Sequence, residues 1–275
     1  MEIKKYEFTD ETLTWYGHTL HRIKALRDFG NVITGELGGW IEKEDNLDHE
    51  GNCWVYQNAK VYDNAEVKDN AKVYGYAVVY GYAKVCHNAK VYGHAQVFDY
   101  AIIRDDTEVY DIAKVYGYAD VFNSANVCGN SMVYGEAWVF GWGWVCDNAK
   151  VYGNARVFGH ANVGNYAQVY GNASVCGYAE IFGYAKVFGS ANVCGNAEIL
   201  GDVVIKETKD YAVFKNIWSS GRWFTWTRSN DMWKVGCFYG TGEELIKKAY
   251  ADSEISGKCY EMVVTNHSKL LEVLK

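Results

Sequence analysis

The sequence concentrates aromatic and basic side chains in two short stretches that lie eighteen residues apart. We call this set the tryptophan cluster, and its members are Trp138, Phe140, Trp142, Trp144, Arg156 and His160. Indole rings beside a guanidinium and an imidazole can clamp a planar ligand or anchor a partner protein. The same residues could instead lie beneath a terminal segment of the chain or in an oligomer contact. If the protein binds something, we expect binding at this cluster.

A second aromatic and basic group lies near the C-terminal end of the sequence. Its members are Trp218, Arg222, Trp223, Trp226, Arg228 and Trp233. Four tryptophans exceed what the core of so short a segment needs, so the group predicts a secondary aromatic pocket. The alternative is a small core with a docking surface.

Two histidines, His94 and His160, could act as the general base of an acyl transfer. The sequence places no second catalytic group beside either of them. His87 occupies a similar turn position, and His in such a turn is usually solvated because it tolerates left-handed backbone. The primary interpretation therefore includes no catalytic residue.

Eight cysteines are present, and two pairs are spaced by eighteen residues: Cys128 with Cys146, and Cys176 with Cys194. Two thiolates without further ligands make a poor zinc site, so we expect no metal site. We expect these cysteines to be reduced and to pack as small apolar side chains. Asp105, Asp106 and Glu108 form an acidic group near Arg104, which predicts a solvated face and not acid–base chemistry.

The element that must position these side chains is an internal repeat from Val55 to Ile205. Every sixth residue is Val or Ile without insertion or deletion, and a small residue, mostly Ala, stands two residues earlier. The unit reads Asn-Ala-Lys-Val-Tyr-Gly, as at residues 88–93. Ala and Val point to one side of a strand and Lys and Tyr to the other, while Gly and Asn tolerate the positive φ of a corner.

Three hexads of equal length close one coil of eighteen residues. The repeat therefore predicts an all-β solenoid: a left-handed parallel β-helix of hexapeptide repeats, with about eight coils over residues 53–206. Residues eighteen apart then stack, which places Arg156 over Trp138 and His160 over Trp142.

The segments on either side of the repeat must close its ends, because an open solenoid exposes apolar core and unpaired strand edges. Residues 1–52 are predicted to form an N-terminal β cap with strands at 6–8 and 19–26. Residues 207–275 are predicted to form a small Trp-rich α+β domain. Its expected strands are 211–218, 222–228, 232–238 and 259–265, and its expected helices are 241–252 and 267–274.

The approach to the repeat also carries a family resemblance. Leu-Arg-Asp-Phe-Gly-Asn-Val at 26–32, Gly-Glu-Leu-Gly-Gly-Trp at 35–40, Asn-Leu at 46–47 and Gly-Asn-Cys-Trp-Val-Tyr at 51–56 resemble the opening of YdcK-type hexapeptide-repeat proteins of bacteria. Similar openings occur in phage and prophage proteins with Asn-Ala-Lys-Val-Tyr-Gly repeats. The resemblance covers residues 20–205 and implies the β-helix. YdcK-type proteins are named acetyltransferases, but that name rests on the repeat, and a fold is not evidence of chemistry.

One outward column of the repeat is aromatic in every coil. It consists of Tyr62, Tyr80, Phe98, Tyr116, Tyr134, Tyr152, Tyr170 and Phe188. These rings could stack on themselves and stiffen the solenoid, or they could form a contact between copies of the chain. We expect a homo-oligomer, and the resemblance to hexapeptide-repeat proteins favours a trimer over a dimer.

The charge pattern narrows the choice of partners. The net charge is −7 and no basic stripe is present, so we expect no binding to nucleic acid through phosphates. No apolar run has the length of a membrane span, and residues 1–5 do not resemble a signal peptide, so we expect no membrane and a cytoplasmic location.

Two functions are compatible with these features. The first is a non-catalytic binding protein, expected to be phage- or prophage-encoded, that binds or sequesters a host protein or a small ligand and needs no cofactor. The alternative is a hexapeptide-family acyltransferase that uses acetyl-CoA, with His160 or His94 as base. The repeat extrudes no loop of the kind that carries such a histidine, which favours the first function.

Overall fold

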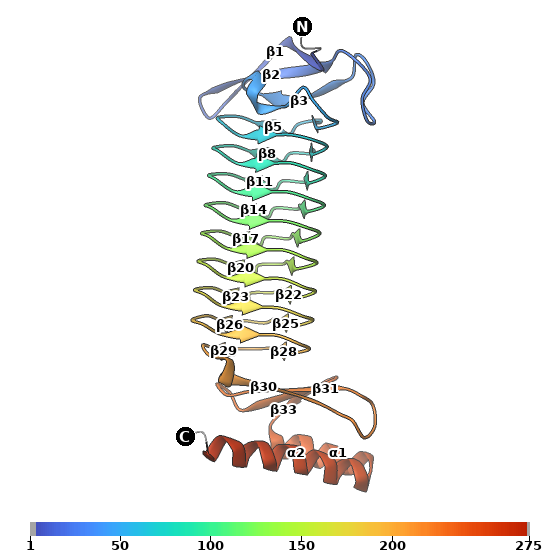
Figure 1. Cartoon of the computed structure of the whole chain (residues 1–275), viewed down its shortest axis with the longest axis vertical. Helices are drawn as coiled ribbons and strands as arrows, with labels where there is room; N and C mark the ends of the chain where they lie inside the picture. The colour runs from blue at the N-terminus through green and yellow to red at the C-terminus, as the bar shows by residue number, and fades with distance from the viewer. Residues whose placement is uncertain (1–3, 274–275) are drawn as a thin grey trace.

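The protein is a long solenoid closed at each end by a different cap (Figure 1), and the computed structural model describes residues 4–273. Two-residue strands recur every six residues, from β4 (Trp54–Val55) and β5 (Lys60–Val61) to β29 (Val204–Ile205). They form three parallel faces, one of nine strands, one of eight, and a third that continues into the N-terminal cap. Val91 pairs with Val109 eighteen residues on, so the left-handed β-helix predicted from the repeat is confirmed.

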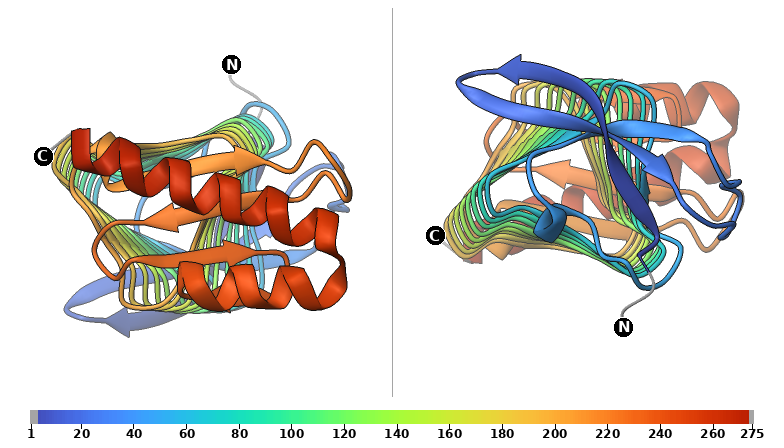
Figure 2. Two further views of the ribbon diagram at one scale, coloured as in Figure 1. Left: turned by 90° about the horizontal axis from the view of Figure 1, so that it is seen from below. Right: turned by 90° about the horizontal axis from the view of Figure 1, so that it is seen from above.

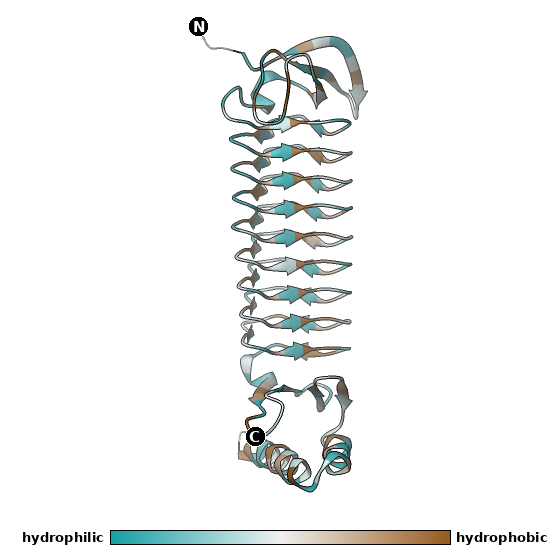
Figure 3. Ribbon diagram, turned by 90° about the vertical axis from the view of Figure 1, so that its right-hand side faces the viewer, coloured by the Kyte–Doolittle hydropathy of each residue, from teal (hydrophilic) through white to brown (hydrophobic). Residues whose placement is uncertain are grey.

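Viewed along its axis, the solenoid is a triangular prism (Figure 2). The Val, Ile and Ala positions of the hexads point inward and are fully buried, as at Ala119 and Val121. Lys and Tyr positions point outward, which gives the alternation of teal and brown along the strands in Figure 3. At each corner, one residue adopts positive φ, usually Gly, Asp or Asn.

The N-terminal cap extends one face of the prism. An antiparallel hairpin of β1 (Tyr6–Trp15) and β2 (His18–Ala25) pairs with β3 (Leu37–Ile41), which lies parallel to β5. A 3-10 turn, η1 (Glu44–Asn46), follows. The two predicted strands fall on this hairpin, but β1 is longer than the predicted 6–8, and β2 begins and ends one residue before the predicted 19–26.

The N-terminal end of the coils would expose carbonyl groups, because each coil accepts its ladder hydrogen bonds from the coil before it. The cap supplies donors to these carbonyls. The Asn46 side chain donates to the carbonyl of Ala65 (2.9 Å), and the fully buried ammonium of Lys5 donates to those of Glu50 (3.1 Å) and Cys53 (3.0 Å). Burial lowers the pKa of Lys5. The carbonyl hydrogen bonds satisfy its protons inside the cap.

The C-terminal end has the opposite need, because the last coil leaves N–H groups without a following coil. Hydroxyl groups accept from them. Thr225 Oγ1 accepts from the N–H of Glu198 (2.9 Å), and Ser229 Oγ accepts from the N–H of Val204 (2.9 Å). The phenol of Tyr211 accepts from the N–H of Cys194 (3.1 Å). The N-terminal cap therefore supplies donors to unpaired carbonyl groups, and the C-terminal unit supplies acceptors to unpaired N–H groups.

The C-terminal unit is an antiparallel sheet with one face toward the last coil and two helices on its other face (Figures 1 and 2). After the turn η2 (Thr208–Asp210), the sheet comprises β30 (Tyr211–Lys215), β31 (Trp223–Thr227), β32 (Met232–Val235) and β33 (Phe238–Gly240). The helices are α1 (Gly242–Asp252) and α2 (Glu254–Val273). Thr241 caps α1, as the sequence suggests, with its hydroxyl accepting from the N–H of Glu244.

The strand predicted at 259–265 is wrong, since those residues belong to α2. Their β-branched run favours a strand locally, but Tyr260, Val263 and Val264 lie on one helical face that packs against the sheet. Gly257, which precedes the segment predicted as that strand, is buried inside α2. A Cβ there would lie 2.2 Å from the Tyr250 ring, so glycine permits the close approach of α1 and α2. The predicted helix 267–274 is the end of α2, and Leu274 lies outside the described residues.

The cysteines differ in part from the expectation that all are reduced. Cys176 and Cys194, stacked on neighbouring coils, form a disulfide with a Cα–Cα distance of 4.6 Å. Stacking in register brings their Cα atoms within the range that a disulfide spans. The other six cysteines are free. None of the helices within residues 4–273 is long and apolar enough to cross a membrane.

Candidate functional site

The tryptophan cluster lies midway along one edge of the prism, and it assembles as the eighteen-residue spacing predicts. Trp138, on β18 (Trp138–Val139), pairs in register with Arg156 on β21 (Arg156–Val157), whose guanidinium lies 5.0 Å from the indole centroid. At the corner, Trp142 stacks on His160 with centroids 4.8 Å apart, and His160 stacks on Tyr178 at the same distance. The basic groups therefore lie on the aromatic faces, and within residues 4–273 neither has an acidic partner.

The indoles of the cluster are unusually exposed for their size. Trp138, Trp142 and Trp144 are 42%, 62% and 45% exposed. Trp144, on β19 (Trp144–Val145), donates its indole N–H to Cys128 Sγ (3.1 Å), so this ring is held in place at its polar end. Phe140 is half-buried in a stack between Phe122 and Phe158, on the same face of the prism as Trp138.

The terminal caps do not cover this surface. The cluster belongs to the central coils, and among residues 4–273 its ring and cation contacts are with neighbouring coils. Burial of the cluster under a terminal segment is therefore contradicted within the described chain.

Gly143 replaces Ala between the indoles, and the structure gives a local reason for this. A Cβ at Gly143 would lie 3.0 Å from the carbonyl oxygen of Val157 and 3.1 Å from that of Phe140. The glycine relieves backbone crowding at this corner. It is therefore not independent support for a bound ligand.

His94 and His160 lie on different edges of the prism, in similar aromatic stacks. His94 stacks on Tyr76 at 5.0 Å, and His160 lies between Trp142 and Tyr178. Neither imidazole has a hydrogen-bonding side-chain partner in the described part of the chain, so neither is oriented or activated by a carboxylate.

The six residues predicted to form a second pocket do not lie together in one pocket. Trp226 and Trp233 are buried on paired strands and face α2, where the His267 ring lies 4.3 Å from Trp226. Trp218 packs instead on Phe224 and Tyr260. The remaining members lie outside this core: Trp223 beside Lys215, Arg222 exposed, and Arg228 near Asp210 at 3.9 Å.

A cavity of about 380 Å³ does open beside Trp226 and Trp233, between the sheet and the two helices. His267 contributes to its wall, and neither ring nitrogen has a hydrogen-bond partner among the described residues. Burial lowers the pKa of His267, which is 5% exposed. Two of the six predicted residues, Trp226 and Trp233, line this cavity, whereas His267 was expected only at the start of a short final helix and not in a pocket.

The fold defines the class: this is a hexapeptide-repeat left-handed β-helix with dissimilar caps. No protein-family model matches the chain. One segment of 41 residues is 56% identical to a protein of Escherichia coli (strain K12) named "Uncharacterized acetyltransferase YdcK". The segment covers 14% of this chain and 13% of that relative, so the resemblance to YdcK is confirmed locally.

Proposed function

We propose that this chain is a non-catalytic binding protein and that the tryptophan cluster is its protein-binding surface. The observation that supports this most directly is the exposure of three neighbouring indoles in coils whose repeat unit most often has Lys, Asn or Tyr at the outward positions. Tryptophan and arginine are the residues that most often dominate binding energy at protein interfaces.

The shape of the surface favours a protein partner over a small ligand. Small-molecule sites are concave and enclose most of the ligand, whereas the Trp142 side chain is mostly exposed at a corner of the prism. A protein with a complementary recess could receive the indole and cover Trp138 and Trp144 beside it. The coils are held by a continuous hydrogen-bonded ladder, so binding would cost little ordering of this surface. A phage or prophage origin and a host protein as partner remain predictions from the sequence resemblance.

The proposal predicts that truncating the corner indole weakens partner binding without loss of the fold. Proteins that co-purify with the wild type from a bacterial lysate would be identified, and the affinity of each purified candidate would be measured. Trp142→Ala should lower that affinity by more than about 2 kcal/mol, or about 30-fold, because a central indole is removed. The melting temperature should change little, since the indole is mostly exposed.

Tyr118→Ala is the matched control, because it removes an exposed aromatic ring from another edge of the same solenoid. It should leave affinity unchanged. Equal affinity of the wild type and Trp142→Ala for every captured protein would contradict the proposal.

An acyltransferase that uses acetyl-CoA remains the second candidate, and the name of the locally similar protein is what favours it. His160 or His94 would then be the base. Acyl transfer to an amine or hydroxyl acceptor, abolished by His160→Ala or His94→Ala in a folded protein, would establish this alternative in place of the binding function.

A further inference from the structure

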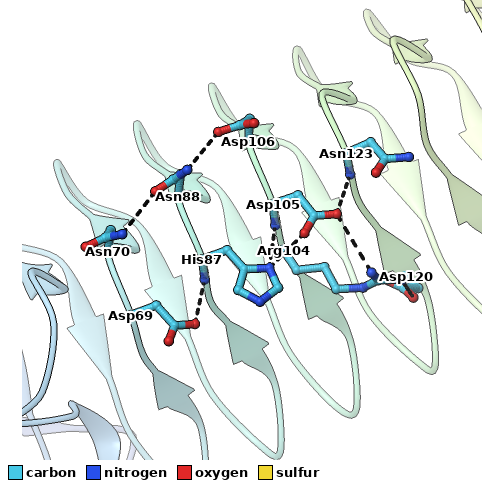
Figure 4. Close-up of polar contacts among 9 residues, drawn as sticks. All are labelled: Asp69, Asn70, His87, Asn88, Arg104, Asp105, Asp106, Asp120 and Asn123. Atoms are coloured by element: carbon cyan, nitrogen blue, oxygen red, sulfur yellow. Dashed lines mark hydrogen bonds and ion pairs between the residues drawn. The ribbon is translucent and has the colours of Figure 1, made fainter.

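The edge that carries the tryptophan cluster has a second, polar half nearer the N-terminal cap (Figure 4). There, three successive coils place Asp69, His87 and Asp105 at the same corner, all with positive φ. Asp69 Oδ2 accepts from the backbone N–H of His87 (2.9 Å), and His87 Nδ1 lies 2.7 Å from Asp105 Oδ1. Cys86 directly precedes His87 and follows β9 (Lys84–Val85).

Three different metal-ligating groups converge at this corner. A carboxylate oxygen of Asp69, the Sγ of Cys86 and a ring nitrogen of His87 all lie within 4.8 Å of one another. Tetrahedral zinc holds such ligands about 3.5 Å apart, so binding would draw these three side chains closer together. The backbone bond of Asp69 occupies one carboxylate oxygen and leaves the other available.

The hydrogen bond to Asp105 prepares the imidazole for a metal. His87 Nδ1 lies 2.7 Å from Asp105 Oδ1 and 3.3 Å from the Asp105 backbone nitrogen, so Asp105 engages this side of the ring. In the tautomer with its proton on Nδ1, that N–H donates to the carboxylate and Nε2 has the lone pair that a metal needs. Histidine ligands of metals are commonly oriented by a carboxylate in this way. Asp105 is itself fixed, because its other oxygen accepts from the N–H of Asn123 (3.0 Å).

The local charge also favours a cation. Arg104 donates to Asp120 (2.8 Å), stacks over the Phe122 ring (4.1 Å) and also lies 3.8 Å from Asp105 Oδ2. The Lys68 ammonium is paired with Glu66 (2.7 Å). Asp105 is thus partly neutralised by Arg104, whereas the Asp69 carboxylate has no ion-pair partner among the described residues and supplies the negative charge that favours a cation.

A second cluster of one histidine and two acidic residues differs from this corner in how its imidazole is bonded. At the N-terminal cap, His18 Nδ1 lies 2.9 Å from Glu42 Oε1, and its Nε2 lies 3.6 Å from Asp63 Oδ1. Both ring nitrogens face carboxylates, so that imidazole bridges two acids and leaves no nitrogen for a metal. His87 differs from His18 because a carboxylate contacts one of its ring nitrogens and the other ring nitrogen is available to a metal.

We propose that Asp69, Cys86 and His87 form a binding site for a divalent cation that accepts sulfur and nitrogen ligands, with Zn²⁺ as the best match. Asp105 is the positioning residue for the imidazole, and a fourth coordination position is open to water or another ligand. Binding displaces the Cys86 thiol proton and links two neighbouring coils. The site is separate from the tryptophan cluster, so it stands whether or not the proposed function holds.

The test is a titration of the full-length, reduced protein, first stripped of metal with a chelator, with Zn²⁺ and separately with Co²⁺. Calorimetry should show one Zn²⁺ site, and Co²⁺ should produce a thiolate-to-cobalt charge-transfer absorption. Cys86→Ser and His87→Asn should abolish that absorption and weaken Zn²⁺ binding by at least about tenfold. Asp105→Asn should weaken binding by about tenfold while the absorption remains.

The variants are chosen to preserve the corner. Asn123 occupies the same position two coils beyond His87 with φ +62°, so Asn at position 87 is compatible with the backbone. Cys128→Ser and Cys237→Ser are the matched thiol controls and should bind like the wild type. Absence of Zn²⁺ binding by the wild type, or unchanged binding in both Cys86→Ser and His87→Asn, would overturn the proposal.

Discussion

At the residue scale, the positions of side chains along an edge follow from the sequence, but their orientations do not. The eighteen-residue spacing predicts the stacking of His160 on Trp142 and of Arg156 on Trp138, because in-register strands align equivalent residues. The same spacing aligns Asp69 with His87. Whether that imidazole turns toward an acid or toward solvent depends on rotamers and on how Arg104 is paired, which spacing does not specify.

His267 provides a residue-scale prediction about pH. Its pKa is lowered from 6.5, mainly by burial and also by Arg228, whereas Asp231 acts in the opposite direction. The unfolded chain therefore binds this proton more readily than the folded one. The contribution of neutral His267 to stability is complete above pH 6.5 and is lost as the pH falls toward the folded-state pKa.

Hydrogen exchange of peptides from α2 can measure this effect, because it reports local opening. After correction for the intrinsic exchange rate, protection in the wild type should fall between about pH 7 and about pH 5, a range that includes the ordinary pKa of histidine. His267→Phe should remove most of that fall, since Phe fills the aromatic surroundings without titrating. His94→Phe, at an exposed corner, is the control. An identical fall in His267→Phe would show that other groups are responsible.

At the element scale, regular elements are predicted well where one residue pattern repeats and poorly where packing decides. In each hexad, the positions of Ala and Val identify the residues that point inward. Because the same pattern recurs in every coil, the register of β4 to β29 can be predicted from many equivalent positions. In α2, the segment from Cys259 to Thr265 has a local strand preference that contact with the sheet overrides. The length of the β1–β2 hairpin was likewise not predictable, because its outer half lies beyond the prism and follows no repeat.

The inward face of a coil supports a stability prediction. Val121 on β15 (Asp120–Val121) is fully buried among Val, Ile and Ala side chains. Val121→Asp would place an unpaired carboxylate there, and we expect it to destabilise the coils by at least about 3 kcal/mol or to cause aggregation. Thermal unfolding monitored by circular dichroism would measure the change.

Lys114→Asp is the matched control, because it introduces the same carboxylate on the outward side of β14 (Lys114–Val115). It should lower the melting temperature far less. A melting temperature of Val121→Asp equal to that of the wild type would be incompatible with the inward orientation of this residue.

At the scale of the whole molecule, the two caps give the solenoid a direction. The N-terminal cap provides donors to free carbonyls, and the C-terminal sheet provides acceptors to free N–H groups, so neither end offers an open ladder to another copy. Association through the ends into filaments is therefore disfavoured, and contacts between copies should use the sides of the prism.

The aromatic column from Tyr62 to Phe188 is the side contact that we expect between copies. Its rings stack with centroids 4.8–5.2 Å apart, which buries their faces against one another. Beyond Tyr62, which lies beneath the cap, the rings remain half-buried, so their outer edges form a continuous apolar strip. A second copy would cover more of this surface than self-stacking does.

The resulting prediction is a homo-oligomer, with a trimer favoured over a dimer. Light scattering at micromolar concentration should give a multiple of the 31.1 kDa chain mass. Tyr116→Lys with Tyr134→Lys should shift the protein toward monomer, because two adjacent charges would have to be buried in the contact. Tyr166→Lys, on an exposed corner outside the column, should leave the mass unchanged. A wild-type mass of 31.1 kDa would instead mean that the rings satisfy one another within a single chain, and the column would then serve only to stiffen the solenoid.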